Sequence, residues 1–200
     1  MERYKFYPVI GVKRLFQGNK NLVGSVFMKG IPSPDECIGL LRQSGCSEKV
    51  LNHCMAVRDY AVRIAVKADA DVVLVEAGAL LHDIGRCVTH GIFHGVEGGR
   101  VAKKLGLPIA IVNIIERHVG AGISKVEAKK MGLPVKDYSP VSLEEKIVCH
   151  ADSLINDVIQ VSLEAQVENA RGKGLNEYAE RLVFLHRELS NICGMDVNLI

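Results

Sequence analysis

The chain has 200 residues and a mass of 21.8 kDa, which suits one compact domain. A hydrophobic fraction of 48% with 24% charged residues excludes a wholly disordered chain, and no apolar run reaches the roughly 18 residues of a membrane span. The formal net charge of +2 gives no overall attraction to nucleic acid or to an acidic membrane, so the composition favours neither as a partner.

The first 30 residues differ in charge from the rest of the chain. Residues 1–30 carry six basic residues and one acidic residue, a net charge of +5. They contain no continuous apolar core and no small-residue cleavage pattern, so we do not interpret them as a signal peptide. We expect a basic arm outside the core domain of residues 31–200, with Met28 as an alternative start of translation.

The six cysteines are scattered and form no Cys-x-x-Cys pair. In a chain without a convincing signal peptide, this usage predicts reduced, mostly buried thiols and a cytoplasmic location. The cysteines are Cys37, Cys46, Cys54, Cys87, Cys149 and Cys193.

From residue 33 onward, apolar spacing and capping residues predict helix after helix. Ser33 and Glu36 form a capping box around Pro34 and predict the start of the first helix. Residues 71–84 are almost wholly apolar, which predicts a helix at the centre of the domain, with Gly85 as its C-cap. The other predicted helices cover 47–68, 94–105, 108–118, 124–132, 142–158, 160–170 and 175–191. No alternating strand pattern persists, so the predicted fold class is all-α.

Several polar residues fall where the helices should be apolar. His82 and Asp83 stand side by side at the end of the central helix, where unpaired polar groups would be costly. A metal ion would give both of them a partner. Helical phase places further candidates on inward faces: His53, His94, His118 and Asp152. These histidines and aspartates offer nitrogen and oxygen donors and no thiolate, a combination that suits Fe, Mn, Co, Ni or Zn.

These residues carry a resemblance to a known family. His53, His82-Asp83 and Asp152 match the H…HD…D pattern of the HD-domain superfamily of metal-dependent phosphohydrolases, and residues 82–85 resemble its HDIG variant. His94 and His118 resemble the two extra histidines of binuclear members. The resemblance covers roughly residues 45–160. Residues 33–152 are also similar to uncharacterised archaeal HDIG proteins and, in layout, to bacterial HD hydrolases of diadenosine tetraphosphate.

The resemblance implies an HD-domain helical bundle around a buried site for two divalent transition-metal ions. His53, His82, Asp83 and Asp152 would hold one ion, and Asp83 would bridge to a second ion on His94 and His118. A metal-activated water would hydrolyse a phosphate ester or anhydride on a nucleotide-like small molecule. Asp83, His82 and Arg86 would act in catalysis. A homo-oligomer is compatible with this interpretation.

Basic residues near these motifs are candidate phosphate ligands. Arg86 follows the His82-Asp83 doublet directly, and Arg117 precedes His118. Lys125 and Lys129 lie on the short helix predicted after His118, and Lys130 follows them. The lysines fit a solvated basic helix face equally well.

Some alternatives stay open at this stage. His90 is four residues before His94 and is a competing ligand, although Gly91 disfavours one continuous helix there. His150 and His186 are expected to be ordinary core residues. Val119 replaces a second histidine after His118 and no Gly-Tyr-Pro follows, which is unlike the cyclic-di-GMP phosphodiesterases of the family.

Two other functions fit the same ligands. HD-fold oxygenases with a mixed-valent di-iron site use a similar set, and oxygen consumption with a strict iron requirement would identify one. The second alternative function is a non-catalytic binding module stabilised by metal, which would bind metal without turnover.

Overall fold

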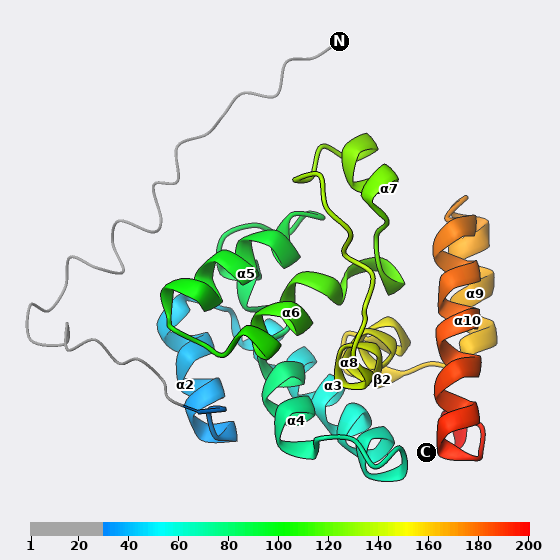
Figure 1. Ribbon diagram of the computed structural model, residues 1–200, viewed down its shortest axis with the longest axis horizontal. Helices are drawn as coiled ribbons and strands as arrows, with labels where there is room; N and C mark the ends of the chain where they lie inside the picture. Colours follow the sequence, from blue (N-terminus) through cyan, green and yellow to red (C-terminus); the bar gives the residue numbers. More distant parts are fainter. Residues whose placement is uncertain (1–29) are drawn as a thin grey trace, which may run out of the picture.

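The computed structural model describes residues 30–200, and within them the fold is helical apart from one tiny hairpin (Figure 1). The proposed basic arm and the alternative start at Met28 lie outside the described residues, apart from Gly30. The α-helices are α2 (Pro34–Ser44), α3 (Glu48–Lys67), α4 (Val72–Leu81), α5 (His94–Lys104), α6 (Ile109–Arg117), α7 (Lys125–Lys130), α8 (Leu143–Leu154), α9 (Leu163–Gly172) and α10 (Asn176–Cys193). Three 3₁₀ turns are η1 (Ile84–Cys87), η2 (Val119–Ala121) and η3 (Val197–Leu199). The predicted all-α class is confirmed.

Helix starts follow the predicted caps. Ser33 accepts a hydrogen bond from the Glu36 amide, and the Glu36 side chain accepts one from the Ser33 amide in return. The same reciprocal box at Ser124 starts α7. Among the described helices, none is long and apolar enough to cross a membrane.

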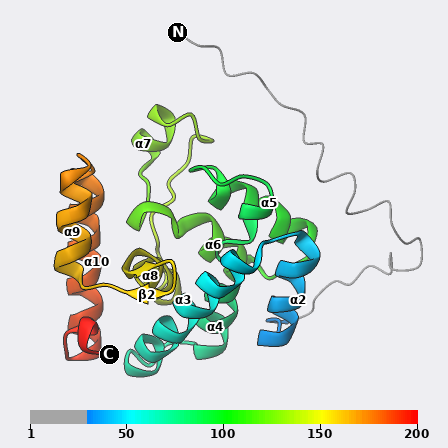
Figure 2. The same cartoon turned by 180° about the vertical axis from the view of Figure 1, so that it is seen from behind.

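The apolar helix α4 lies in the middle of the fold, as predicted. It contacts α2, α3, α6 and α8, and nearly all of its second half is buried. Its first turn reaches the surface, where Val73 is 60% exposed. Helices α9 and α10 run side by side along one flank, next to α8 (Figures 1 and 2). The polar residues that end α4 are therefore held at the centre of the molecule.

Gly85 is not the C-cap of α4, contrary to the sequence-based expectation. Helix α4 ends at Leu81, and Gly85 lies inside η1, where its backbone packs against α5. A Cβ at this position would lie 1.9 Å from the His94 carbonyl oxygen and 2.5 Å from the Gly98 amide nitrogen. Only glycine therefore allows η1 and α5 to approach this closely.

The predicted helix 142–158 is too long by one turn. Helix α8 ends at Leu154, and the chain then forms an antiparallel hairpin of β1 (Ile155–Asn156) and β2 (Ile159–Gln160). Asp157 at the turn has a φ of 55°, a conformation that Asn and Asp adopt more readily than most residues. The Asn156-Asp157 pair therefore forms a turn in place of the last helical turn.

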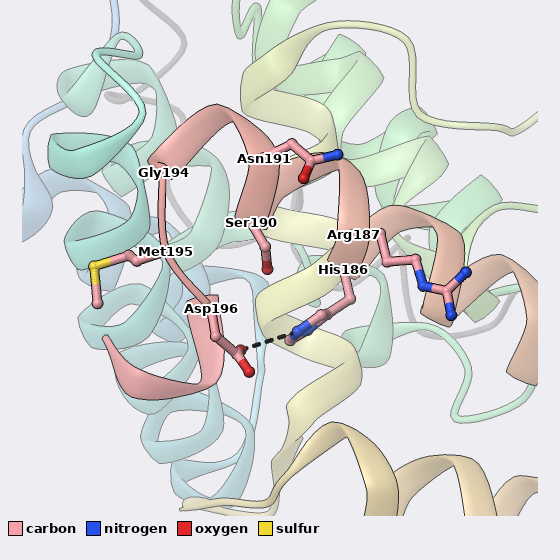
Figure 3. Close-up of a pocket in the computed structure, with 7 residues that line it drawn as sticks. All are labelled: His186, Arg187, Ser190, Asn191, Gly194, Met195 and Asp196. Atoms are coloured by element: carbon pink, nitrogen blue, oxygen red, sulfur yellow. Dashed lines mark hydrogen bonds and ion pairs between the residues drawn. The ribbon is translucent and has the colours of Figure 1, made fainter.

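His150 and His186 form a buried hydrogen-bonded chain, which supports the expected core role. His150 Nε2 lies 3.1 Å from His186 Nδ1, and His186 Nε2 lies 3.1 Å from a carboxylate oxygen of Asp196. His186 and Asp196 line a surface pocket of about 510 Å³ at the C-terminal end of α10 (Figure 3). None of the six candidate metal ligands lines this pocket.

We expect His150 to make the protein less stable in acid. Burial, with a smaller contribution from His186, lowers the pKa of His150 to about 3. Between that value and the ordinary pKa of about 6.5, the unfolded chain takes up a proton that the folded chain does not. This residue should therefore reduce the free energy of unfolding by up to about 1.4 kcal/mol for each pH unit below about 6.

The measurement is urea unfolding of chelator-treated protein between pH 7 and pH 5, for the wild type and for His150→Gln. Glutamine keeps a polar group but does not titrate, so the wild type should lose more stability than the variant as the pH falls. Parallel pH profiles for the two proteins would contradict this prediction.

Candidate metal centre

The structure brings all six predicted metal ligands into one cluster at the middle of the fold. They come from five separate places in the chain, and three overlapping groups of their donor atoms each lie within 4.8 Å of one another. Their positions are His53 on α3, His82 and Asp83 at the exit of α4, His94 at the start of α5, His118 after α6 and Asp152 in the last turn of α8.

The Asp83 carboxylate lies between two groups of imidazoles. Its Oδ2 is 3.8 Å from His82 Nε2 and 4.0 Å from His53 Nε2. Its Oδ1 is 3.3 Å from His94 Nε2 and 3.7 Å from His118 Nε2. Each oxygen therefore faces a different pair of histidines, as expected for a carboxylate that bridges two cations.

Asp152 belongs to the first of these two groups. Its Oδ1 lies 3.0 Å from His53 Nε2 and 3.3 Å from His82 Nε2. The side chains of His53 and Asp152 are 16% and 22% exposed, whereas those of the other four candidate ligands are at most 8% exposed. The His53 and Asp152 side of the cluster is therefore the side open to solvent.

Every histidine in the cluster presents Nε2 inward and has Nδ1 beside a backbone carbonyl. Three of them have Nδ1 beside the carbonyl three residues earlier, at 2.7 to 2.8 Å. His53 differs, because its Nδ1 lies 2.8 Å from the carbonyl oxygen of Asp157 at the hairpin turn. A nitrogen facing a carbonyl must donate, so each ring carries a proton on Nδ1 and turns Nε2 into the cluster. With this orientation, Nε2 is the atom of each ring that is available to a metal ion.

Two observations show that these residues fit a bound cation. His82 Nε2 and Asp83 Oδ1 are buried and have no hydrogen-bond partner in the described part of the chain. His94 Nε2 and His118 Nε2 lie only 2.9 Å apart, although the hydrogen bonds at Nδ1 leave a lone pair on each. Facing lone pairs and unpaired buried acceptors are unfavourable unless a cation or a proton lies between them.

The electrostatics keep His94 and Asp83, but not His82, in the forms that bind metal. Burial lowers the pKa of His82, but Cys54 and the carboxylates of Asp83 and Asp152 outweigh burial and hold this pKa above its usual range, so a metal ion that binds there has to displace a proton. Burial and the neighbouring His118 lower the pKa of His94 to about 4. Burial raises the pKa of Asp83, but the facing His82 and His118 outweigh burial and hold this pKa below its usual range. At neutral pH, His94 is therefore neutral and Asp83 is ionised, as metal coordination requires.

Arg86 lies at the cluster, as the sequence suggested. Its Nε donates to Asp83 Oδ2, its Nη1 donates to the His90 carbonyl oxygen at 3.4 Å, and its side chain is 30% exposed. His90 itself is exposed and belongs to none of the groups of possible ligands. The structure thus places His94, and not His90, among the residues that could hold a metal ion.

The other basic candidates are placed less favourably. The predicted phosphate ligand Arg117 is held by Glu145, with Nη1 at 3.0 and 2.7 Å from the two carboxylate oxygens. Lys125 and Lys129 are exposed on α7, which stands at the tip of an excursion from the bundle in both views (Figures 1 and 2). Substrate contact by these lysines stays a prediction.

Sequence reasoning missed the residues that orient His53. The Asp157 carbonyl fixes its ring, and Lys49 Nζ lies 2.8 Å from Asp157 Oδ1. The only sequence feature that points to this support is the Asn156-Asp157 pair, a turn former inside a predicted helix.

Comparisons with known proteins agree with this geometry. The family model described as HD domain matches residues 50–157. An uncharacterised protein of Methanocaldococcus jannaschii is 45% identical over 155 residues, which cover 74% of this chain and 91% of that protein. Ribonuclease Y of Petrotoga mobilis is 30% identical over 54% of this chain and 24% of its own length.

Other relatives are longer than this chain. A tRNA (cytidine(56)-2′-O)-methyltransferase of Thermoplasma volcanium is 44% identical over 173 residues, 86% of this chain and 51% of the methyltransferase. The chain therefore spans about half the length of this relative.

A solved structure shows the same fold. The HD domain of the phosphodiesterase PgpH of L. monocytogenes superposes with a TM-score of 0.54 at 18% identity, over 82% of this chain and 96% of that one. The residues 50–157 that match the family model include all six clustered side chains, with His53 near the start of this range and Asp152 near its end. The chain belongs to the HD-domain family, as its H…HD…D pattern predicts.

Proposed function

We propose that this protein is a metal-dependent hydrolase that cleaves a phosphate ester or anhydride on a nucleotide-like small molecule. The observation that carries this proposal is the buried Asp83 carboxylate, whose two oxygens face separate pairs of histidine Nε2 atoms. Neighbours named phosphodiesterase and Ribonuclease Y support hydrolysis of a phosphoester as the reaction class.

Two divalent ions would occupy this cluster. One would bind His53, His82, Asp83 and Asp152, and the other would bind His94 and His118 together with Asp83. The nitrogen and oxygen donors suit Fe, Mn, Co, Ni or Zn. When bound, such ions lower the pKa of a coordinated water and offset the charge of a phosphate group.

The protein's own residues would position the substrate from the open side of the cluster. His53 and Asp152 are the partly exposed ligands, so the phosphate would approach past them. Arg86 is the nearest cation in the described structure with a partly exposed side chain, and its guanidinium would orient a phosphate oxygen. Lys125 and Lys129 would then contact a more distant part of the substrate.

The names of the relatives and of the solved structure support the proposed class of substrate. A structure of the PgpH HD domain is titled as a complex with cyclic-di-AMP, which favours a nucleotide-like ligand for this chain as well. RNA phosphodiesters are the second candidate, because two sets of relatives are named for RNA: Ribonuclease Y and the tRNA methyltransferases. A methyl-transfer activity is not proposed, since this chain spans only about half of those relatives.

The experiment is a substrate screen with protein purified without oxygen and loaded separately with each of the five metals. The panel holds phosphomonoesters, dinucleoside polyphosphates, 2′,3′-cyclic phosphates, cyclic dinucleotides and a labelled RNA oligomer. We expect a phosphate or nucleotide product that is lost in His82→Ala and kept in His90→Ala, since His90 is exposed outside the cluster. Oxygen uptake that requires iron would instead indicate an oxygenase. Metal binding without any turnover would indicate a non-catalytic binding module.

Arg86 should affect substrate binding more than the metal content. We expect Arg86→Ala to raise KM by about 10- to 100-fold, because a charge-assisted hydrogen bond to phosphate is lost. Arg86→Lys should recover part of this loss. Steady-state kinetics on the substrate found in the screen, with elemental analysis of each variant, makes the test. An unchanged KM in Arg86→Ala would exclude this role.

The number of bound ions separates a binuclear site from a mononuclear one. We expect about two ions per chain in the wild type and about one in His94→Ala. The substitution removes a ligand of the ion held by His94 and His118, and it leaves the ligands of the other ion in place. His90→Ala is the matched control and should keep the wild-type content. Elemental analysis of anaerobically purified protein gives the ratio. One ion in both wild type and His94→Ala would remove His94 and His118 from the ligand set.

The turn at Asp157 should control how tightly the ligand group that contains His53 binds metal. Asp157→Pro cannot adopt a φ of 55°, so it should displace the carbonyl that orients His53. We expect metal affinity to fall about 10- to 100-fold, the usual loss when a partner of a ligating histidine is removed.

Asp157→Gly is the control for this change. Glycine accepts a positive φ and keeps the carbonyl, while both variants lose the ion pair with Lys49. Titration against a coloured chelator measures the affinity. Equal affinities in the proline and glycine variants would show that the turn does not support His53.

A further inference from the structure

Two of the six cysteines meet beside the metal centre although they are distant in sequence. Cys46 lies in the turn between α2 and α3, and Cys87 is the last residue of η1. The Cys46 sulfur lies 3.6 Å from the Ile84 carbonyl oxygen, so the turn between α2 and α3 packs on η1. This sulfur also lies within hydrogen-bonding reach of the Cys87 thiol. The sequence contains no Cys-x-x-Cys pair, so it gives no sign of this contact.

The other cysteines are placed differently. All six fall within the described residues, and all six are free thiols. Cys37, Cys54 and Cys149 are fully buried, and Cys193 ends α10 at the far flank. Cys46 and Cys87 are both partly exposed, so a small oxidant can reach the pair.

The hydrogen bond between the two thiols makes them chemically unequal. The hydrogen bond from Cys46 lowers the pKa of Cys87, although burial opposes it. The same hydrogen bond, with burial, raises the pKa of Cys46. Cys87 is therefore the better nucleophile, and Cys46 is a thiol held ready beside it.

We propose that Cys46 and Cys87 form an oxidation site that a hydroperoxide converts into a disulfide. The Cys87 thiolate sulfur attacks one peroxide oxygen, the O–O bond breaks, and a sulfenic acid and, with H₂O₂, one water result. The Cys46 sulfur then displaces the hydroxyl group from Cys87, forming the S–S bond and a second water. In total, two thiols and one H₂O₂ give one disulfide and two waters.

One cysteine of the pair, Cys87, lies close in sequence to Asp83 and Arg86, two of the residues proposed to act in catalysis. Cys87 follows Arg86 directly, and Arg86 donates to Asp83. A disulfide requires the two Cβ atoms to lie about 3.5–4.5 Å apart, so the new bond would fix the end of η1 against the α2–α3 turn. The oxidation itself does not depend on the proposed hydrolase activity.

The test treats the full chain, stripped of metal with a chelator, with one equivalent of H₂O₂. We expect the intact mass to fall by two hydrogens, the mapped peptides to show a Cys46–Cys87 cross-link within one chain, and dithiothreitol to reverse both changes. A cross-link that joins other cysteines, a cross-link between chains, or no cross-link would overturn the proposal. This map needs no variant, so it does not depend on whether a mutant folds.

Serine variants test the roles of the two thiols. Cys87→Ser should abolish the disulfide, and Cys46→Ser should leave a sulfenic acid on Cys87 that dimedone traps. Cys193→Ser is the matched control, because Cys193 is partly exposed but outside the pair, and it should form the disulfide as the wild type does. A dimedone adduct on Cys46 in Cys87→Ser, with none on Cys87 in Cys46→Ser, would contradict the assignment of Cys87 as the nucleophile.

Discussion

The candidate site is arranged around one buried carboxylate that has four imidazole nitrogens around it. Asp83 is 2% exposed, and a charge in that position is costly unless it is closely paired. The surrounding elements are arranged so that Nε2 atoms face both of its oxygens. Helix α4 brings the residue to the centre, and Gly85 lets η1 approach α5 closely enough for His94 to reach it. Replacing the glycine would separate the two halves of the cluster.

The histidine rings are oriented by backbone carbonyls. Three of them use the carbonyl three residues earlier in the chain, so the local backbone fixes each of these rings. The fourth, His53, uses the carbonyl of Asp157, which is distant in sequence. The site is thus built from local contacts on its buried side and from a long-range contact on its open side, where substrate would enter.

Much of this site could be predicted because it rests on local information. Capping residues such as Ser33 and Glu36 fix helix starts, and helical phase shows that His53 and Asp152 face inward. The hairpin after α8, the packing role of Gly85 and the Cys46 contact at η1 could not be predicted. Each of these features depends on tertiary contacts between distant segments. Residue type and periodicity in a single sequence do not specify such contacts.

Residues beyond the HD family match also support the centre. Arg181 on α10 donates to Glu127 on α7 at 2.8 Å and to the Gly120 carbonyl oxygen at 3.2 Å, two residues after His118. The His150–His186 hydrogen bond joins α10 to α8, the helix that carries Asp152. Helix α10 therefore braces the elements that carry His118 and Asp152. A cluster of facing lone pairs needs such bracing, because without it the helices could relieve their repulsion by moving apart.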